Sequence, residues 1–250
     1  MKLALFSDIH ANIQAFDTCL AHARGEGATQ FALLGDFVGY GADPVAVVQR
    51  ARQLAADGAW LIKGNHDAGA VTPPAVAKTW GDSTAAWTHA QLEPGQLQFL
   101  DALPLTLVHG TLMLVHASAD GPELWRYVYD DIAAAASLDA AAQLPEVRHV
   151  FGGHVHHQTL YGSALGATVK KLAPRLGVAV PLPASRHWLA TIGSVGQPRD
   201  GNPQAMYATF DTGNPALTFH RVSYDHSAAA AAIRKAGLPD WLAIRLALGR

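Results

Sequence analysis

Short apolar runs alternate with amphipathic segments over the first 65 residues of the chain. The apolar runs at 2–7, 30–34 and 59–62 predict strands, and the segments 13–24 and 43–56 have the apolar spacing of helices. Such alternation is typical of βαβ units, in which the strands run parallel in one sheet. We therefore expect an α/β fold that begins with a parallel sheet.

From residue 104 onwards the pattern becomes one of closely spaced strands. Residues 105–108 and 111–115 predict a hairpin, because residues 109–110 between them, with Gly110 second, match a two-residue turn. Residues 213–215 (Gly-Asn-Pro) separate the last two predicted strands and indicate a second hairpin. The later predicted strands are 148–152, 158–162, 169–173, 187–192, 205–210 and 216–224.

The other segments are expected to be helical or irregular. Residues 68–93 lack a clear period apart from a short helix at 80–89, and a helix is predicted from about 94 to 100. Residues 120–146 are rich in Ala and predict helix. The C-terminal segment, about 226–247, predicts helix with a break at Gly237-Leu238-Pro239, and we expect one domain over residues 1–250.

Metal-binding side chains follow five of the predicted strands. Ligands of open α/β sheets bind outside the carboxyl ends of the strands, so we expect these side chains to meet at one edge. Seven candidates exceed the three protein ligands of a typical catalytic zinc site and fit two metals that share a carboxylate. Carboxylate, imidazole and amide donors suit manganese, iron or zinc. The candidates are Asp8, His10, Asp36, Asn65, His116, His154 and His156.

The same segments resemble, in order and spacing, the motif set of the calcineurin-like metallophosphoesterases. The resemblance covers residues 3 to about 212 and rests on Asp8-x-His10, Gly35-Asp36-Phe37-Val38-Gly39, Gly64-Asn65-His66-Asp67, Val115-His116 and Gly153-His154-Val155-His156. The strings 7–12, 35–44 and 193–201 are similar to the small single-domain bacterial branch. That branch includes the YfcE-type phosphodiesterases and the diadenosine tetraphosphatase-like proteins.

The resemblance implies a fold, a pair of ions and a set of roles. The fold is a four-layer αββα sandwich of two mixed β-sheets flanked by helices. The ions are divalent or trivalent, manganese and/or iron, with zinc and nickel as alternatives. A hydroxide that bridges them attacks phosphorus, and His66 is the non-ligand histidine beside the leaving group. Asp8, His10, Asp36 and His156 hold one ion, and Asp36 bridges to a second ion held with Asn65, His116 and His154.

Three further residues are candidates for the site. Arg199 lies in a tight loop between two strands, where it either binds substrate phosphate through its planar guanidinium or is an ordinary surface arginine. Asn12 either caps the first helix or contacts phosphate, and Asp67 either orients an imidazole or caps the following turn.

Other features leave two interpretations open. Tyr40 and Trp125 either stack on a nucleoside base or belong to the core and rim. His157 follows a ligand, but its side chain should point away from the site. The proline-containing segment 174–186 is either a surface insertion or a lid.

Composition narrows the function further. Half of the residues are hydrophobic, only 15% are charged and the net charge is −2, so we expect no nucleic-acid polymer as partner. The single Cys19 excludes an intramolecular disulfide framework and fits a reducing compartment. Without a signal-peptide pattern or an apolar run of membrane-spanning length, we expect a cytoplasmic protein with no membrane contact.

We expect an enzyme that hydrolyses a phosphoester or phosphoanhydride of a small, nucleotide-like substrate. One alternative is a phosphoprotein serine/threonine phosphatase, but those relatives carry Arg soon after the second motif and end the third in Glu, where this chain has Tyr40 and Asp67. The other is an inert scaffold with the same fold, which the full set of ligands and His66 disfavours. The oligomeric state is left open.

Overall fold

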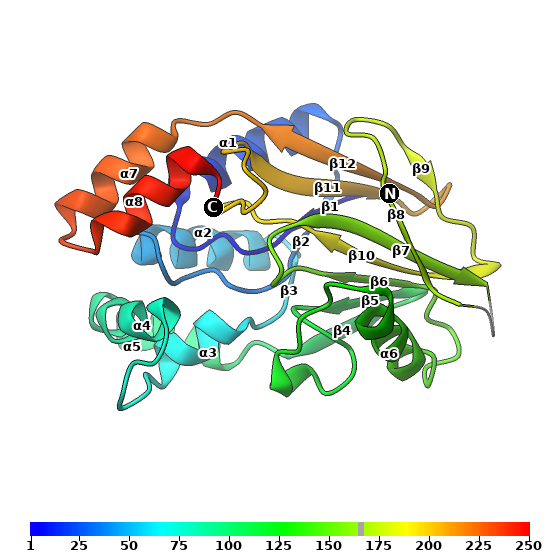
Figure 1. Ribbon diagram of the computed structural model, residues 1–250, viewed down its shortest axis with the longest axis horizontal. Helices are drawn as coiled ribbons and strands as arrows, with labels where there is room; N and C mark the ends of the chain where they lie inside the picture. The colour runs from blue at the N-terminus through cyan, green and yellow to red at the C-terminus, as the bar shows by residue number, and fades with distance from the viewer. Residues whose placement is uncertain (165–167) are drawn as a thin grey trace.

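Two six-stranded mixed sheets lie between helices in the computed structural model, which describes residues 1–164 and 168–250 (Figure 1). The expected αββα sandwich is therefore confirmed. No helix in those two ranges is both long and apolar enough to cross a membrane.

The first sheet contains the N-terminal parallel strands. β1, β2 and β3 run parallel, β11 pairs antiparallel with β1, and β11 and β12 form the hairpin expected around residues 213–215. In spatial order the strands are β3 (Trp60–Leu61), β2 (Gln30–Leu33), β1 (Lys2–Phe6), β11 (Ala205–Asp211), β12 (Ala216–Val222) and β9 (Val180–Pro181).

The second sheet contains the other strands that lead to candidate ligands. β5, β6 and β10 run parallel in it. The β4–β5 hairpin is present, but His109 pairs with Leu112, so the turn is Gly110-Thr111, one residue later than predicted. Gly110 has a φ of 58°, which glycine adopts without strain. The spatial order is β4 (Thr106–His109), β5 (Leu112–Val115), β6 (His149–Gly152), β10 (Arg186–Ile192), β7 (Gln158–Ala164) and β8 (Lys170–Leu172).

The helices cover the outer faces of the sheets and the ligand end of the first sheet. α3 was not predicted, and only α6 and a short 3₁₀ turn, η1 (Pro122–Leu124), are helical within 120–146. The C-terminal break is confirmed, since α7 ends before Gly237, which has a φ of 71°. The α-helices are α1 (Ile13–Gly25), α2 (Pro44–Ala56), α3 (Asn65–Val71), α4 (Trp80–Gln91), α5 (Pro94–Asp101), α6 (Asp131–Ala141), α7 (His226–Lys235) and α8 (Asp240–Leu248).

Alternating side chains of β1 build two separate cores. Leu3 and Leu5 pack between the two sheets, whereas Ala4 and Phe6 pack beneath the helices on the outer face. Because successive side chains of a strand point to opposite faces, a strand that is apolar throughout is buried on both sides. This burial holds the end of β1, and the ligands that follow it, in a rigid frame.

Val180 and Pro181, within the segment 174–186, lie at the end of the first sheet opposite to the candidate ligands. Val180 pairs with Leu217 at the start of β12, and Leu182 is buried and accepts a hydrogen bond from His149 Nε2 at 2.9 Å. β9 therefore extends the edge of the first sheet near the start of β1 (Figure 1). This part of the segment is therefore an edge insertion, whereas Pro174 and Leu176 line a cavity with Val155 and His157.

Candidate metal centre

The candidate ligands meet where the carboxyl ends of the two sheets adjoin. Strands β1, β2 and β3 of the first sheet and β5 and β6 of the second lead into them. The expectation of one sheet edge is thus corrected, since both sheets build the site. Six of the seven candidates are buried, namely Asp8, His10, Asp36, His116, His154 and His156.

Five of these residues have left-handed backbone conformations. The φ angles are 53° at Asp8, 49° at His10, 55° at Asp36, 68° at His154 and 58° at His156. Non-glycine residues rarely adopt such angles, and strain of this kind concentrates at functional sites. The conformation turns successive side chains toward the junction of the sheets.

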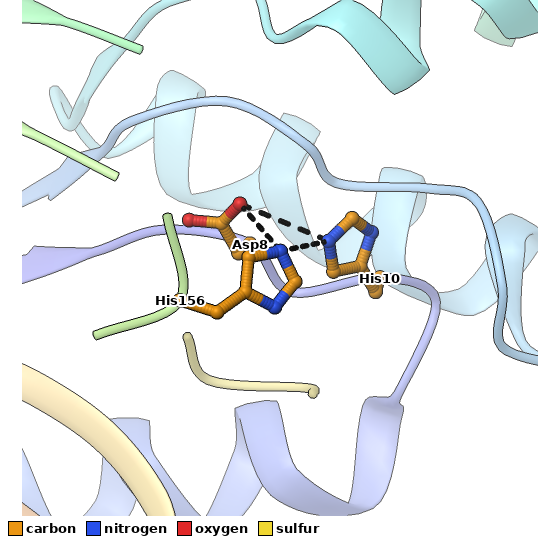
Figure 2. Close-up of side chains that lie close together, drawn as sticks. All are labelled: Asp8, His10 and His156. Atoms are coloured by element: carbon orange, nitrogen blue, oxygen red, sulfur yellow. Dashed lines mark hydrogen bonds and ion pairs between the residues drawn. The ribbon is translucent and has the colours of Figure 1, made fainter. Parts of the chain in front are cut away.

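Asp8, His10 and His156 form a first group of donors (Figure 2). His10 Nδ1 lies 3.1 Å from the Val38 carbonyl, and His156 Nδ1 lies 2.6 Å from the Gln197 carbonyl. A carbonyl only accepts, so each Nδ1 carries the proton and each Nε2 carries a lone pair. Burial, and next the charge of Arg199, lower the pKa of His156, while burial and His156 lower that of His10, so both rings are neutral at pH 7.

The unprotonated atoms of this group point at one another. His10 Nε2 lies 3.1 Å from His156 Nε2, and Asp8 Oδ1 lies 3.2 Å from His156 Nε2. Asp8 Oδ1 is buried and has no hydrogen-bond partner within the described chain. Three acceptors this close repel unless a cation lies between them, so the first group fits a metal ion.

Asp36, His116, His154 and Asn65 form a second group. His116 Nε2 lies 3.3 Å from Asp36 Oδ2 and 3.2 Å from Asn65 Oδ1, while its Nδ1 faces the Leu34 carbonyl at 2.7 Å. His154 directs Nε2 to the Trp125 carbonyl at 3.0 Å, which leaves its Nδ1 lone pair free. Asp36 Oδ2 also lies 3.8 Å from His10 Nε2, so this carboxylate stands between the two groups.

The electrostatics of the second group also favour a cation. Burial opposes the charged form of His116, but the carboxylates of Asp36 and Asp8 outweigh it and raise its pKa to about 10. The negative potential of the two carboxylates therefore stabilises a proton on His116, and it would stabilise a metal ion at the same place.

His66 stands beside both groups at the wall of a cavity. Its ring centroid lies 4.5 Å from that of Tyr40 and 5.0 Å from that of His10. The cavity has a volume of about 280 Å³, and its lining includes Asn65, His66 and Tyr127. Burial lowers the pKa of His66, against the opposing effect of Asp36.

Asp67 holds the loop that carries Asp36. Its carboxylate accepts hydrogen bonds from the backbone N–H groups of Gly64, Asp36 and Phe37, each at 2.8 Å, and of Val38 at 3.3 Å. None of these hydrogen bonds involves an imidazole, so the alternative that Asp67 orients a histidine ring is not supported. It caps the start of α3 and fixes the Asp36 loop.

Asn12 is occupied by structural hydrogen bonds. Its Oδ1 accepts from Ala15 N–H at the start of α1, and its Nδ2 donates to Gly196 O and Tyr224 Oη. Both N–H groups and the oxygen are used, so the expected phosphate contact is corrected to a helix cap that also holds the 193–201 loop.

Arg199 does face the site. Its guanidinium donates to Gln197 Oε1 and lies 5.7 Å from the ring of Tyr40, and its charge lowers the pKa values of His66 and His156. His157 lines a different cavity, with Tyr129 and Lys171, as its predicted direction implied.

The loop 121–130 contacts the candidate ligands in ways that the sequence did not predict. Trp125 contacts His154 through its backbone carbonyl and His116 through its ring, edge-on at a centroid distance of 6.0 Å. Tyr127 stacks on His154 with a centroid distance of 4.0 Å. Tyr40 packs against His10 and His66. A loop without a period carries no signal that could have placed Trp125 or Tyr127.

Comparison with known proteins identifies the family. The model of the calcineurin-like phosphoesterase superfamily domain matches residues 1–214. The chain belongs to this superfamily. It is accordingly a metal-dependent phosphoester hydrolase, and its clusters of His and Asp could bind the metal ions.

Individual relatives of this phosphoesterase match over almost the whole chain. An uncharacterized protein of Methanocaldococcus jannaschii, MJ0912, is 31% identical, over 99% of this chain and 98% of its own. The crystal structure of a metallophosphoesterase from Sphaerobacter thermophilus is 33% identical with a TM-score of 0.88, and the match covers 100% and 99% of the two chains. The hypothetical protein PH1004 from Pyrococcus horikoshii shares the fold at 18% identity, with a TM-score of 0.77 and coverage of 100% and 98%.

Proposed function

We propose that this phosphoesterase holds two metal ions and hydrolyses a phosphoester or phosphoanhydride of a small, nucleotide-like substrate. The facing lone pairs of His10 and His156 beside the unpartnered Asp8 Oδ1 carry the proposal. One ion would be held by Asp8, His10 and His156, and the other by Asn65, His116 and His154. Asp36 would bind both ions. When bound, such a pair activates water at neutral pH and neutralises charge on phosphate oxygens; the proposed ions are manganese and/or iron.

His66 is proposed as the proton donor to the leaving oxygen. Its ring borders the 280 Å³ cavity next to Asn65, so a leaving group in that cavity would lie against it. Although burial lowers its pKa, a phosphate anion bound beside the ring would favour the imidazolium form. Proton transfer to the departing oxygen would then avoid the build-up of an alkoxide.

The cavity favours a small substrate over a protein. Ligand pockets commonly measure about 300–1,000 Å³, so a volume of about 280 Å³ fits a compact leaving group. The net charge of −2 also disfavours a long polyanion. No feature of the site favours the phosphoprotein alternative.

A hydrolysis screen with added manganese tests the function. We expect turnover of diadenosine tetraphosphate or bis-p-nitrophenyl phosphate, less of p-nitrophenyl phosphate and none of a phosphopeptide, all abolished by a chelator and restored by metal. Preference for the phosphopeptide would shift the function to the phosphoprotein class. No turnover of any substrate by metal-loaded protein would support the inert scaffold.

Substitution of Arg199 tests its proposed contact with substrate phosphate. Because a charged hydrogen bond contributes about 1.5–3 kcal/mol, Arg199→Ala should raise KM for diadenosine tetraphosphate roughly ten- to hundredfold. KM for bis-p-nitrophenyl phosphate should rise less, and Arg199→Lys should recover part of the loss, since it lacks the planar fork. Equal shifts in KM for both substrates, or none, would contradict a specific contact of Arg199 with the additional phosphate.

A further inference from the structure

The C-terminal helices pack on the loop that follows Asp36. Residues 226–248 lie beyond the span matched by the family model, which ends at residue 214. Tyr40 packs against the apolar cluster of α7 and α8, which includes Ile233 and Leu246. Figure 1 shows the two helices together at one end of the first sheet. An element outside the matched domain therefore borders the metal centre.

This packing brings two arginines to one aromatic ring. The guanidinium carbon of Arg245, on α8, lies 5.7 Å from the centroid of the Tyr40 ring, and that of Arg199 lies at the same distance. The Tyr40 ring itself lies 4.5 Å from His66 and 4.7 Å from His10. The Tyr40 ring thus contacts two arginines as well as His66, the proposed catalytic histidine, and His10, a candidate metal ligand.

Neither Arg199 nor Arg245 forms an ion pair with an Asp or Glu side chain in the described parts of the chain. The arginines that form ion pairs in the described parts of the chain are Arg50, Arg126, Arg221 and Arg234. Arg199 donates to the amide of Gln197, and Arg245 donates to a carboxyl oxygen of Arg250, the last residue of the given sequence. Arg199 Nε is buried and has no hydrogen-bond partner among residues 1–164 and 168–250.

Arg199 and Arg245 repel each other across the region of Tyr40, and an anion bound near both would lower that repulsion. Burial, and next the charge of Arg199, lower the pKa of Arg245 to about 10, so its guanidinium group remains charged at neutral pH. Each arginine presents only donors, whereas the metal ligands present only acceptors. The region around Tyr40 is therefore complementary to anionic oxygens, separately from the metal groups.

We propose that Arg199 and Arg245 form a second anion subsite beside the metal centre, which binds a phosphate group next to the one that is cleaved. The inference rests on the proposed function for the identity of the cleaved group. It narrows the substrate to phosphoesters or phosphoanhydrides that carry a second phosphate, such as nucleoside polyphosphates. It also makes the C-terminal helices part of the substrate-binding wall.

Binding of non-hydrolysable phosphonates to the manganese-loaded protein tests the subsite. We expect calorimetry to show tighter binding of methylenediphosphonate than of methylphosphonate. Arg245→Gln should reduce the ratio of the two affinities by roughly tenfold, because a charged hydrogen bond is lost. Arg245→Met, which keeps a long apolar side chain on α8 but removes the charge, should do the same. The matched control Arg234→Gln, on the exposed side of α7, should keep the preference of the wild type.

The outcomes separate the subsite from the function. If Arg245→Met folds with full metal content and an unchanged preference, the subsite is wrong even when the enzyme hydrolyses phosphoesters. If both Arg245 variants unfold while Arg234→Gln does not, Arg245 has a structural role and the proposal fails. If the preference depends on Arg245 but no substrate is hydrolysed, the subsite stands and the proposed function falls.

Discussion

Replacement of His66 by alanine or asparagine is expected to lower kcat by about 10²–10⁴-fold while metal content stays unchanged. The ring borders the cavity beside Asn65 and, in the described structure, makes no hydrogen bond that would tie it to another element. Its loss should therefore remove proton donation without disturbing the fold. Steady-state kinetics and elemental analysis of the same preparations measure both quantities.

The leaving group distinguishes an acid role from other effects. Aryl phosphate esters release a stable phenolate that needs no proton, so the His66 variants should lose less activity toward them than toward alkyl or nucleotide esters. His109→Ala is a matched control, because His109 is exposed at the β4–β5 turn and should leave both activities unchanged. Equal losses on aryl and alkyl substrates would contradict the acid role.

Replacement of Asp36 by asparagine is expected to reduce the bound metal from two ions per chain to one or fewer. Asp36 Oδ2 faces His116 in one group and His10 in the other, so loss of its charge weakens both sites. Activity should fall by at least about a hundredfold, more than typically follows loss of an outer-shell partner. Elemental analysis of protein reconstituted with manganese measures the ratio.

An exposed carboxylate provides the control for this substitution. Asp101 is exposed at the end of α5 and forms an ion pair with Lys63, so Asp101→Asn should retain two ions and full activity. If wild-type protein binds one ion that excess manganese does not change, the dinuclear proposal is wrong. If Asp36→Asn keeps two ions, Asp36 does not bridge.

Local sequence patterns predicted the strands and the residues at their ends. β1 and β2 are apolar on both faces because each packs between a helix layer and the other sheet, and such runs are recognisable without tertiary information. Asp, His and Asn side chains that recur directly after five strands have few roles other than binding a metal. The seven ligand candidates therefore followed from the sequence, and their convergence in two groups followed from the parallel order of β1–β3 and of β5–β6.

Short-range signals failed where a long-range contact determines the local structure. α3 is only seven residues long, and Asp67 stabilises its start while binding the amides of residues 36–38, which no local pattern encodes. The segment 174–186 pairs along the sheet edge through only two residues, too few to show a strand period. The β4–β5 turn moved by one residue because strand register depends on the pairing of both strands.

The sequence by itself determined the fold class, the family resemblance and the set of candidate metal ligands, since each rests on periodicity or spacing along the chain. Only the tertiary structure decided how the polar side chains are used. Asn12 became a cap because Gly196 and Tyr224 reach its amide, and Arg245 became a neighbour of Arg199 because α8 packs on Tyr40. Such pairings join residues about 45 to 210 positions apart, and their free energy depends on distances that the chain acquires only when its layers pack.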